Sequence, residues 1–118
     1  MAYYIYIVRC RDGSHYTGIA AHLCQRMHEH YERLSTCARY TRAHPVVALD
    51  GLWKAEDRSS AGKLEYAIKQ LSKEKKLYLM QHGQEVHEIL PKLAEEKYEY
   101  IPRITLEMCL DGTFKDGN

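Results

Sequence analysis

Long apolar runs, paired cysteines and internal repeats are all missing from this 118-residue sequence. No stretch approaches the roughly 20 apolar residues that a membrane-spanning helix needs, and the first residues lack the regions of a secretory signal. The cysteines form no Cys-x-x-Cys pair, which disfavours a zinc ribbon or a redox motif. They are Cys10, Cys24, Cys37 and Cys109. We therefore expect a cytoplasmic protein with reduced cysteines, no membrane partner and no small-molecule cofactor.

The charge is small overall but unevenly distributed. The length suits a single domain, and 45% hydrophobic with 28% charged residues is typical of a globular protein. The net charge is +1, yet the chain through Gln81 carries 13 Lys and Arg against 8 Asp and Glu, whereas the remainder carries 4 against 8. A basic body suits a polyanionic ligand, and an acidic remainder can shield that ligand's site.

The spacing of apolar residues predicts an α+β domain with a small, three-stranded antiparallel sheet flanked by helices. The expected order is β-β-α-β-α-α plus a C-terminal helical tail. The strands are expected at residues 3–10, 15–20 and 46–54, with Gly51 at a bulge, and the helices at 21–34, after Asp57 and after Ser72. Residues 83–118 are expected to form an acidic helical extension with a frayed end, and an edge strand within YEYIPRITLEMCL at 98–110 is an open alternative.

The loop of the first hairpin decides which side chains share a face of the sheet. A two-residue Asp12-Gly13 turn would place Tyr6 and Tyr16 on opposite faces. A three-residue loop at 11–13, with glycine in the left-handed region, would instead pair Tyr6 with Gly18 and put both tyrosines on one face. Glycine weakens a strand, so free space beside a functional tyrosine is one good reason for Gly18.

Four short motifs occur in order along residues 3–81. They are YIY at 4–6, YTG at 16–18, QRMHEH at 25–30 and KLEYAIKQLS at 63–72. Together they resemble the GIY-YIG nuclease superfamily, and most of all its small stand-alone bacterial members. Tyr4 stands where the family name has glycine. The resemblance implies a GIY-YIG endonuclease-like domain at residues 1–82, with residues 83–118 packed on or beside it.

The resemblance implies a phosphodiesterase that uses one divalent metal ion, Mg²⁺ or Mn²⁺. The catalytic positions that carry over are Tyr6, Tyr16, Arg26, His30 and Glu65. Their chemistry is suitable: Glu65 offers a hard oxygen ligand, Arg26 a bidentate phosphate contact, and a tyrosine hydroxyl can orient water. His30 can act as acid or base, or hold Tyr6 in place. Arg26 and His30 are four residues apart, which places them on one helical face.

A basic rim is expected to bind nucleic acid around these residues. Its members are Arg39, Arg42, Lys69, Lys73 and Lys76. We expect DNA, rather than RNA, as the substrate, with branched, nicked and single-stranded forms as candidates and DNA repair as a fitting role. The alternative is a nucleic-acid-binding module that keeps the fold without cutting. Taken singly, each of these residues is explained as a strand tyrosine or a solvated surface charge, so the prediction depends on their occurrence together.

Overall fold

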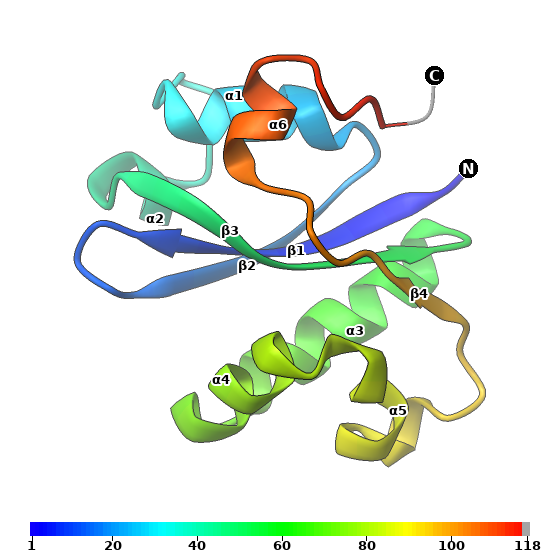
Figure 1. The fold of residues 1–118 in the computed structure, drawn as a ribbon. Helices are drawn as coiled ribbons and strands as arrows, with labels where there is room; N and C mark the ends of the chain where they lie inside the picture. Colours follow the sequence, from blue (N-terminus) through cyan, green and yellow to red (C-terminus); the bar gives the residue numbers. More distant parts are fainter. Residues whose placement is uncertain (117–118) are drawn as a thin grey trace.

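The computed structural model describes residues 1–116 and has a four-stranded antiparallel sheet at its centre (Figure 1). The strand order is β2-β1-β3-β4. The strands are β1 (Tyr3–Cys10), β2 (His15–Ala20), β3 (Val46–Ala55) and β4 (Tyr98–Tyr100). The α+β class is as predicted, but the expected count of three strands is wrong. The fourth strand is the edge strand that the sequence left as an alternative: the short β4 pairs with only the end of β3, between Trp53 and Ala55, and three residues are too few for periodicity to decide between strand and loop.

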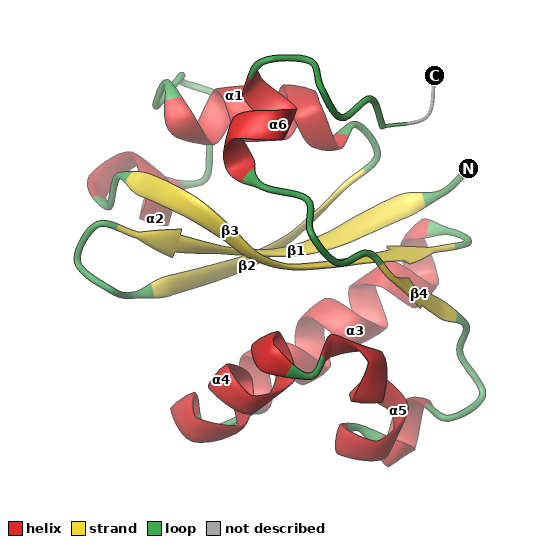
Figure 2. Ribbon diagram, viewed as in Figure 1, coloured by secondary structure: helices red, strands yellow, loops and turns green. Residues whose placement is uncertain are grey.

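Helices cover both faces of the sheet (Figure 2). They are α1 (Leu23–Tyr31), α2 (Arg39–Ala43), α3 (Arg58–Gln70), α4 (Lys73–Gln81), α5 (Val86–Ile89) and α6 (Leu106–Leu110), with 3₁₀ turns at Gly83–Glu85 and Pro91–Leu93. Helices α1 and α6 lie over one face, and α3, α4 and α5 over the other. The N-caps of α3 and α4 are Asp57 and Ser72, as predicted. Helix α1 is shorter than expected, and α2 forms inside a stretch for which the sequence predicts no element.

Each face of the sheet has its own apolar core because β1 is buried on both sides. Even-numbered residues of β1 face α1 and α6, and odd-numbered residues face α3. The first core includes Tyr4, Tyr6, Val8, Leu23, Met27 and Leu106. The second includes Ile5, Ile7, Trp53, Leu64 and Ile68. The predicted strand bulge is also present, since Ile7 pairs with Gly51 while Val8 pairs with Leu49.

The hairpin adopts the three-residue loop. Gly13 has a φ of 87°, which is the left-handed conformation that such a loop requires. Tyr6 pairs with Gly18 and Val8 pairs with Tyr16, so the two tyrosines point to the same face of the sheet. The register prediction is confirmed, and it places both phenol rings under α1.

The C-terminal segment returns from β4 to the opposite face and ends against α1. Thr105 caps α6 by accepting a hydrogen bond from Met108 N–H at 3.1 Å. The Asp116 carboxylate then accepts a bond from Cys24 N–H, in the first turn of α1, at 3.2 Å. The expected frayed tail is therefore wrong for Asp116, and Gly117 and Asn118 lie outside the described residues. The proposed division of the chain at residue 82 stays a prediction.

Within the described residues, none of the helices has the length and apolar character that a bilayer crossing demands.

Candidate active site

Tyr6 lies at the centre of a buried polar cluster between β1 and α1. Its side chain is fully buried, and its hydroxyl is 2.8 Å from His30 Nε2. Arg26 Nε donates a second hydrogen bond to the same hydroxyl at 3.3 Å. Space for the phenol comes from Gly18, because a Cβ there would lie 2.5 Å from the Tyr6 oxygen. A side chain on the paired strand would therefore displace the hydroxyl from both of its partners.

The protonation of His30 follows from its other neighbour, Thr41. The Thr41 hydroxyl donates its single proton to the carbonyl of Ala38 at 3.1 Å, so it must accept from His30 Nδ1 at 2.7 Å. Burial lowers the pKa of His30 to about 4, with the charge of Arg26 acting in the same direction, so the ring is neutral near pH 7. Nε2 is then the bare nitrogen, and the Tyr6 hydroxyl donates to it.

The electrostatic environment keeps Tyr6 protonated. Burial raises the pKa of its hydroxyl, and the nearby Glu65 carboxylate acts in the same direction more weakly, while the contact with Arg26 opposes both. Because His30 is also a weak base at this position, transfer of the Tyr6 proton to His30 is unfavourable in the free protein. Tyr6 therefore acts as a neutral group that receives and fixes the Arg26 side chain.

Arg26 is held on three sides and keeps one nitrogen available. Its Nη1 donates to Glu29 at 2.8 Å and to the carbonyl of Thr36 at 2.7 Å, while Nε is bound to Tyr6. The hydrogen bond from Arg26 also lowers the pKa of Glu29, which keeps that carboxylate ionised. No residue within 1–116 hydrogen-bonds to Nη2, so this donor is available to an incoming anion.

Tyr16 is the more accessible of the two tyrosines. It is half-buried on β2, and its ring centroid is 6.4 Å from that of Tyr6 and 5.7 Å from that of His30. Tyr40 of α2 stacks on its outer side at 6.1 Å. The ammonium of Lys69 lies 5.5 Å from the Tyr16 ring centroid. Tyr16 thus joins the buried cluster to the protein surface.

Glu65 approaches the cluster from the other layer of the fold. It lies on α3, which packs against the opposite face of the sheet, and β2 is the edge strand between the two layers. Lys69 donates to Glu65 Oε2 at 3.2 Å and also lies over Tyr16, which joins the two parts of the site around the β2 edge. The Glu65 side chain is 25% exposed, so the carboxylate is accessible to a cation.

The residues of the predicted basic rim differ in their hydrogen bonds and in their exposure to solvent. Arg42 donates to the carbonyls of Ser35 and Cys37, at 2.8 and 3.5 Å, and so braces the segment before α2. Arg39 and Lys73 are exposed, and Lys76 is half-buried on α4. Their role in binding stays a proposal.

Thr41 and Glu29 belong to the cluster, and sequence reasoning missed both. Thr41 is fully buried and holds the His30 ring, while Glu29 holds Arg26. Glu29 is three residues after Arg26, a helical spacing that could have indicated the ion pair. Nothing in the local pattern marks Thr41, because it contacts His30 only through the tertiary fold.

Known proteins resemble the chain in the region that forms this site. Residues 2–78 match the family model described as the GIY-YIG catalytic domain. A UPF0213 protein of Fusobacterium nucleatum is 43% identical over 76 residues, covering 64% of this chain and 74% of that protein. A UPF0213 protein of Xanthomonas axonopodis pv. citri is 39% identical over 90 residues, covering 75% and 86% of the two chains.

Among solved structures, the solution NMR structure of a UPF0213 protein from Bacillus halodurans is 34% identical, with a TM-score of 0.47 over 79% of this chain and 97% of that one. The tyrosine pair of the hairpin and the arginine and histidine of the next helix lie within the residues that this family model matches. The chain belongs to the GIY-YIG family, a nuclease family whose general class of substrate is nucleic acid.

Proposed function

We propose that the protein is a metal-dependent endonuclease that hydrolyses phosphodiester bonds in DNA. The observation that carries the proposal is the fixed Arg26 side chain, which has one free donor beside a half-buried tyrosine and an accessible carboxylate. A guanidinium that is held in place before the substrate binds stabilises the transition state well, because it does not have to move as negative charge develops on the phosphate.

The residues present fit a single hydrated divalent ion. Among residues 1–116, no group of three or more His, Cys, Asp or Glu side chains gathers, so Glu65 would be the one protein ligand. Magnesium commonly binds through one or two carboxylates, with water and phosphate oxygens completing its shell. Lys69 now occupies one Glu65 oxygen and would be displaced, or would turn to a phosphate. The ion, Mg²⁺ or Mn²⁺, would supply charge neutralisation and a more acidic bound water.

The protein's own groups divide the remaining work. Arg26 binds a non-bridging phosphate oxygen through Nη2, while Tyr6 and Glu29 accept from Nε and Nη1 and fix the orientation of the guanidinium. Tyr16, the accessible tyrosine, orients the attacking water. His30 holds Tyr6 rather than acting as a base, because its pKa is about 4.

Replacement of the metal ligand tests the proposal. Glu65→Gln keeps the size and helix propensity of the residue but removes the charge that a hard cation needs. We expect cleavage of plasmid and labelled oligonucleotides with Mg²⁺ or Mn²⁺ to be nearly abolished, while binding in chelator stays within a few fold. Glu88→Gln, at an exposed position on α5, is the matched control and should cut like the wild type. Equal cleavage by Glu65→Gln and wild type would exclude Glu65 as the metal ligand.

A nucleic-acid-binding module without turnover is the second candidate. Two features favour it: Tyr6 is buried and protonated, so it is not poised to take a proton, and Lys69 pairs with the carboxylate that would bind the metal. Wild-type protein that binds oligonucleotides but cuts none of the branched, nicked, single-stranded or RNA substrates with either metal would establish this alternative.

A further inference from the structure

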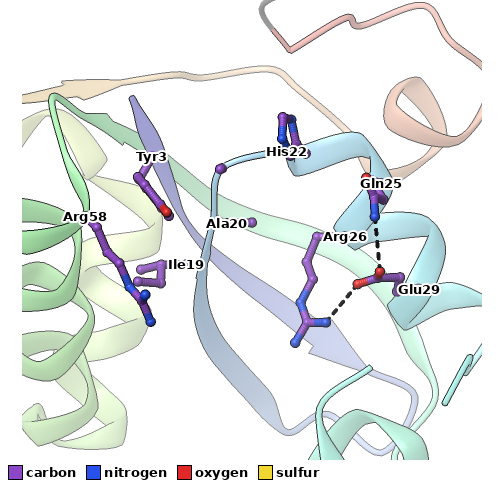
Figure 3. Close-up of a pocket in the computed structure, with 9 residues that line it drawn as sticks. Tyr3, Ile19, Ala20, His22, Gln25, Arg26, Glu29 and Arg58 are labelled. Carbon is purple, nitrogen blue, oxygen red and sulfur yellow. Dashed lines mark hydrogen bonds and ion pairs between the residues drawn. The ribbon is translucent and has the colours of Figure 1, made fainter. Parts of the chain in front are cut away.

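A cleft of about 280 Å³ opens beside Arg26, along the surface of β2 and the turn that follows it (Figure 3). Arg26, His22 and Glu29 of the α1 region line one side, and Arg58 lines the other. Figure 3 shows Arg26 and Arg58 on either side of β2. No other described strand pairs with the outer side of β2, so the cleft lies at an open edge of the sheet.

The guanidinium of Arg58 has no polar partner among the described residues. It is exposed and makes no hydrogen bond or ion pair with any residue from 1 to 116. Arg58 is also the first residue of α3, and no acidic residue occurs in that first turn. A cation is unfavourable there, because the amino end of a helix carries partial positive charge. The Asp57 carboxylate caps this end of the helix and offsets part of that cost, so the free guanidinium is the feature that suits an anionic ligand.

The walls of the cleft between the two arginines suit part of a nucleotide. Ile19 and Ala20 of β2, with Tyr3 of β1, give an apolar and aromatic surface. A sugar or base can lie on such a surface, while its phosphates need cationic donors at the ends. Arg26 and Arg58 are the two cationic groups of the lining; the ion pair of Arg26 with Glu29 has no net charge, so the net positive charge of the lining comes from Arg58.

We propose that this cleft is a second subsite for the nucleic-acid strand, in which Arg58 binds a phosphate next to the one held by Arg26. The strand would cross the open edge of β2, with one sugar and base against Ile19 and Tyr3. This inference rests on the proposed function, because it takes the phosphate at Arg26 as the scissile one. It adds a binding residue that lies outside the catalytic group and outside the basic rim predicted from the sequence.

Binding in chelator separates this subsite from catalysis. We would measure the affinity of a fluorescent single-stranded oligonucleotide by anisotropy at several salt concentrations, for wild type, Arg58→Ala, Arg58→Lys and Lys92→Ala. Lys92 is an exposed lysine in the 3₁₀ turn at Pro91–Leu93 and serves as the control for loss of one positive charge. Arg58→Ala should weaken binding by about tenfold. Its salt slope should fall by about 0.7, the value for one contact to a single strand.

The other variants and the melting temperature complete this test. Lys92→Ala should bind like the wild type, and Arg58→Lys should keep the salt slope because it keeps the charge. Arg58→Ala should melt at the same temperature as the wild type, or slightly higher, since a helix-start cation has been removed. A lower melting temperature, or an affinity loss no greater than that of Lys92→Ala, would overturn the inference.

Substrates with one neutral linkage test the position of the contact. When single methylphosphonates are placed at each linkage of the oligonucleotide in turn, one position should weaken binding to wild type but should not weaken binding to Arg58→Ala any further. Equal losses in both proteins at every position would mean that Arg58 does not touch a phosphate. If the wild type binds with this pattern but cuts nothing, the proposed endonuclease activity fails and the subsite stands. If the wild type shows no oligonucleotide binding, the subsite is refuted as well.

Discussion

Replacement of Thr41 by valine removes one oxygen from the buried cluster while nearly preserving its shape. In the wild type this oxygen accepts from His30 Nδ1 at 2.7 Å and donates to the Ala38 carbonyl at 3.1 Å. His30 Nδ1 would then be left without a partner in the interior, where an unsatisfied polar group costs about 1–3 kcal/mol, whereas the Ala38 carbonyl still accepts from Arg42 N–H at 3.0 Å. We expect Thr41→Val to lower the free energy of unfolding by about 1–3 kcal/mol. Thr41→Ser keeps the hydroxyl and should lose less.

The same variant should change the His30 tautomer. Without Thr41, His30 Nδ1–H has no acceptor, and the proton can move to Nε2, which faces the Tyr6 hydroxyl. Tyr6 would then receive donors from both His30 and Arg26, and its own proton would have no partner. We expect cleavage to fall through a lower kcat, since the Tyr6 hydroxyl would have to reorient and its contact with Arg26 Nε would weaken, although Glu29 and the Thr36 carbonyl still hold Arg26 Nη1.

Nitrogen-15 NMR of the histidine rings is the assay. Wild type should show a protonated Nδ1 and a bare Nε2 for His30 at pH 7, and Thr41→Val should show a mixture or the opposite tautomer. Denaturant unfolding of wild type, Thr41→Val and Thr41→Ser gives the stability order. A wild-type spectrum with the proton on Nε2, or equal stability of all three proteins, would refute the reasoning.

Three further predictions concern the same cluster. Gly18→Ala should lower the free energy of unfolding by about 1–3 kcal/mol and remove most of the cleavage, because the new Cβ would overlap the Tyr6 hydroxyl. Denaturant unfolding and plasmid cleavage measure the two effects, and unchanged activity would contradict the close approach. Tyr16→Phe should lose cleavage but little stability. Tyr6→Phe should lose both, since it leaves the buried Nε2 of His30 without a donor. Equal stabilities of the two variants would count against Tyr6 as the donor to His30. His30 should make the free energy of unfolding rise with pH between about 4 and 6.5, because in that range the His30 ring binds a proton in the unfolded state but not in the native state. His30→Gln should therefore reduce the slope of the free energy of unfolding against pH in that range by up to about 1.4 kcal/mol per pH unit.

The hairpin shows what local sequence can predict. Its register depends on the length of one loop and the left-handed preference of Gly13, and both are encoded within a few residues. The same holds for the start of α3, where Asp57 accepts a hydrogen bond from Ser60 N–H at 2.8 Å. These local signals, with the family resemblance, were enough to place Tyr6, Tyr16, Arg26 and His30 in one cluster.

The elements that the sequence left open or did not predict depend on partners far along the chain. Strand β4 exists through its pairing with Trp53–Ala55, and α2 forms where Thr41 turns inward to meet His30. Arg58 was overlooked for a related reason: a surface arginine after an N-cap resembles any other solvated charge. Its significance comes from lying across a cleft from Arg26, which only the folded chain brings close.

The placement of β4 affects how the protein resists self-association. A sheet of this kind has two outer edges, and an unpaired edge is a template on which another chain can add a strand. Here β4 pairs along the last residues of β3, and Ile101 N–H continues the contact by donating to the Leu52 carbonyl at 2.9 Å. Being only three residues long, β4 offers little backbone for a further strand. A chain cut before Tyr98 would uncover this end of the ten-residue β3 in addition to the open edge at β2, and we expect such a chain to aggregate at a lower concentration than the intact one.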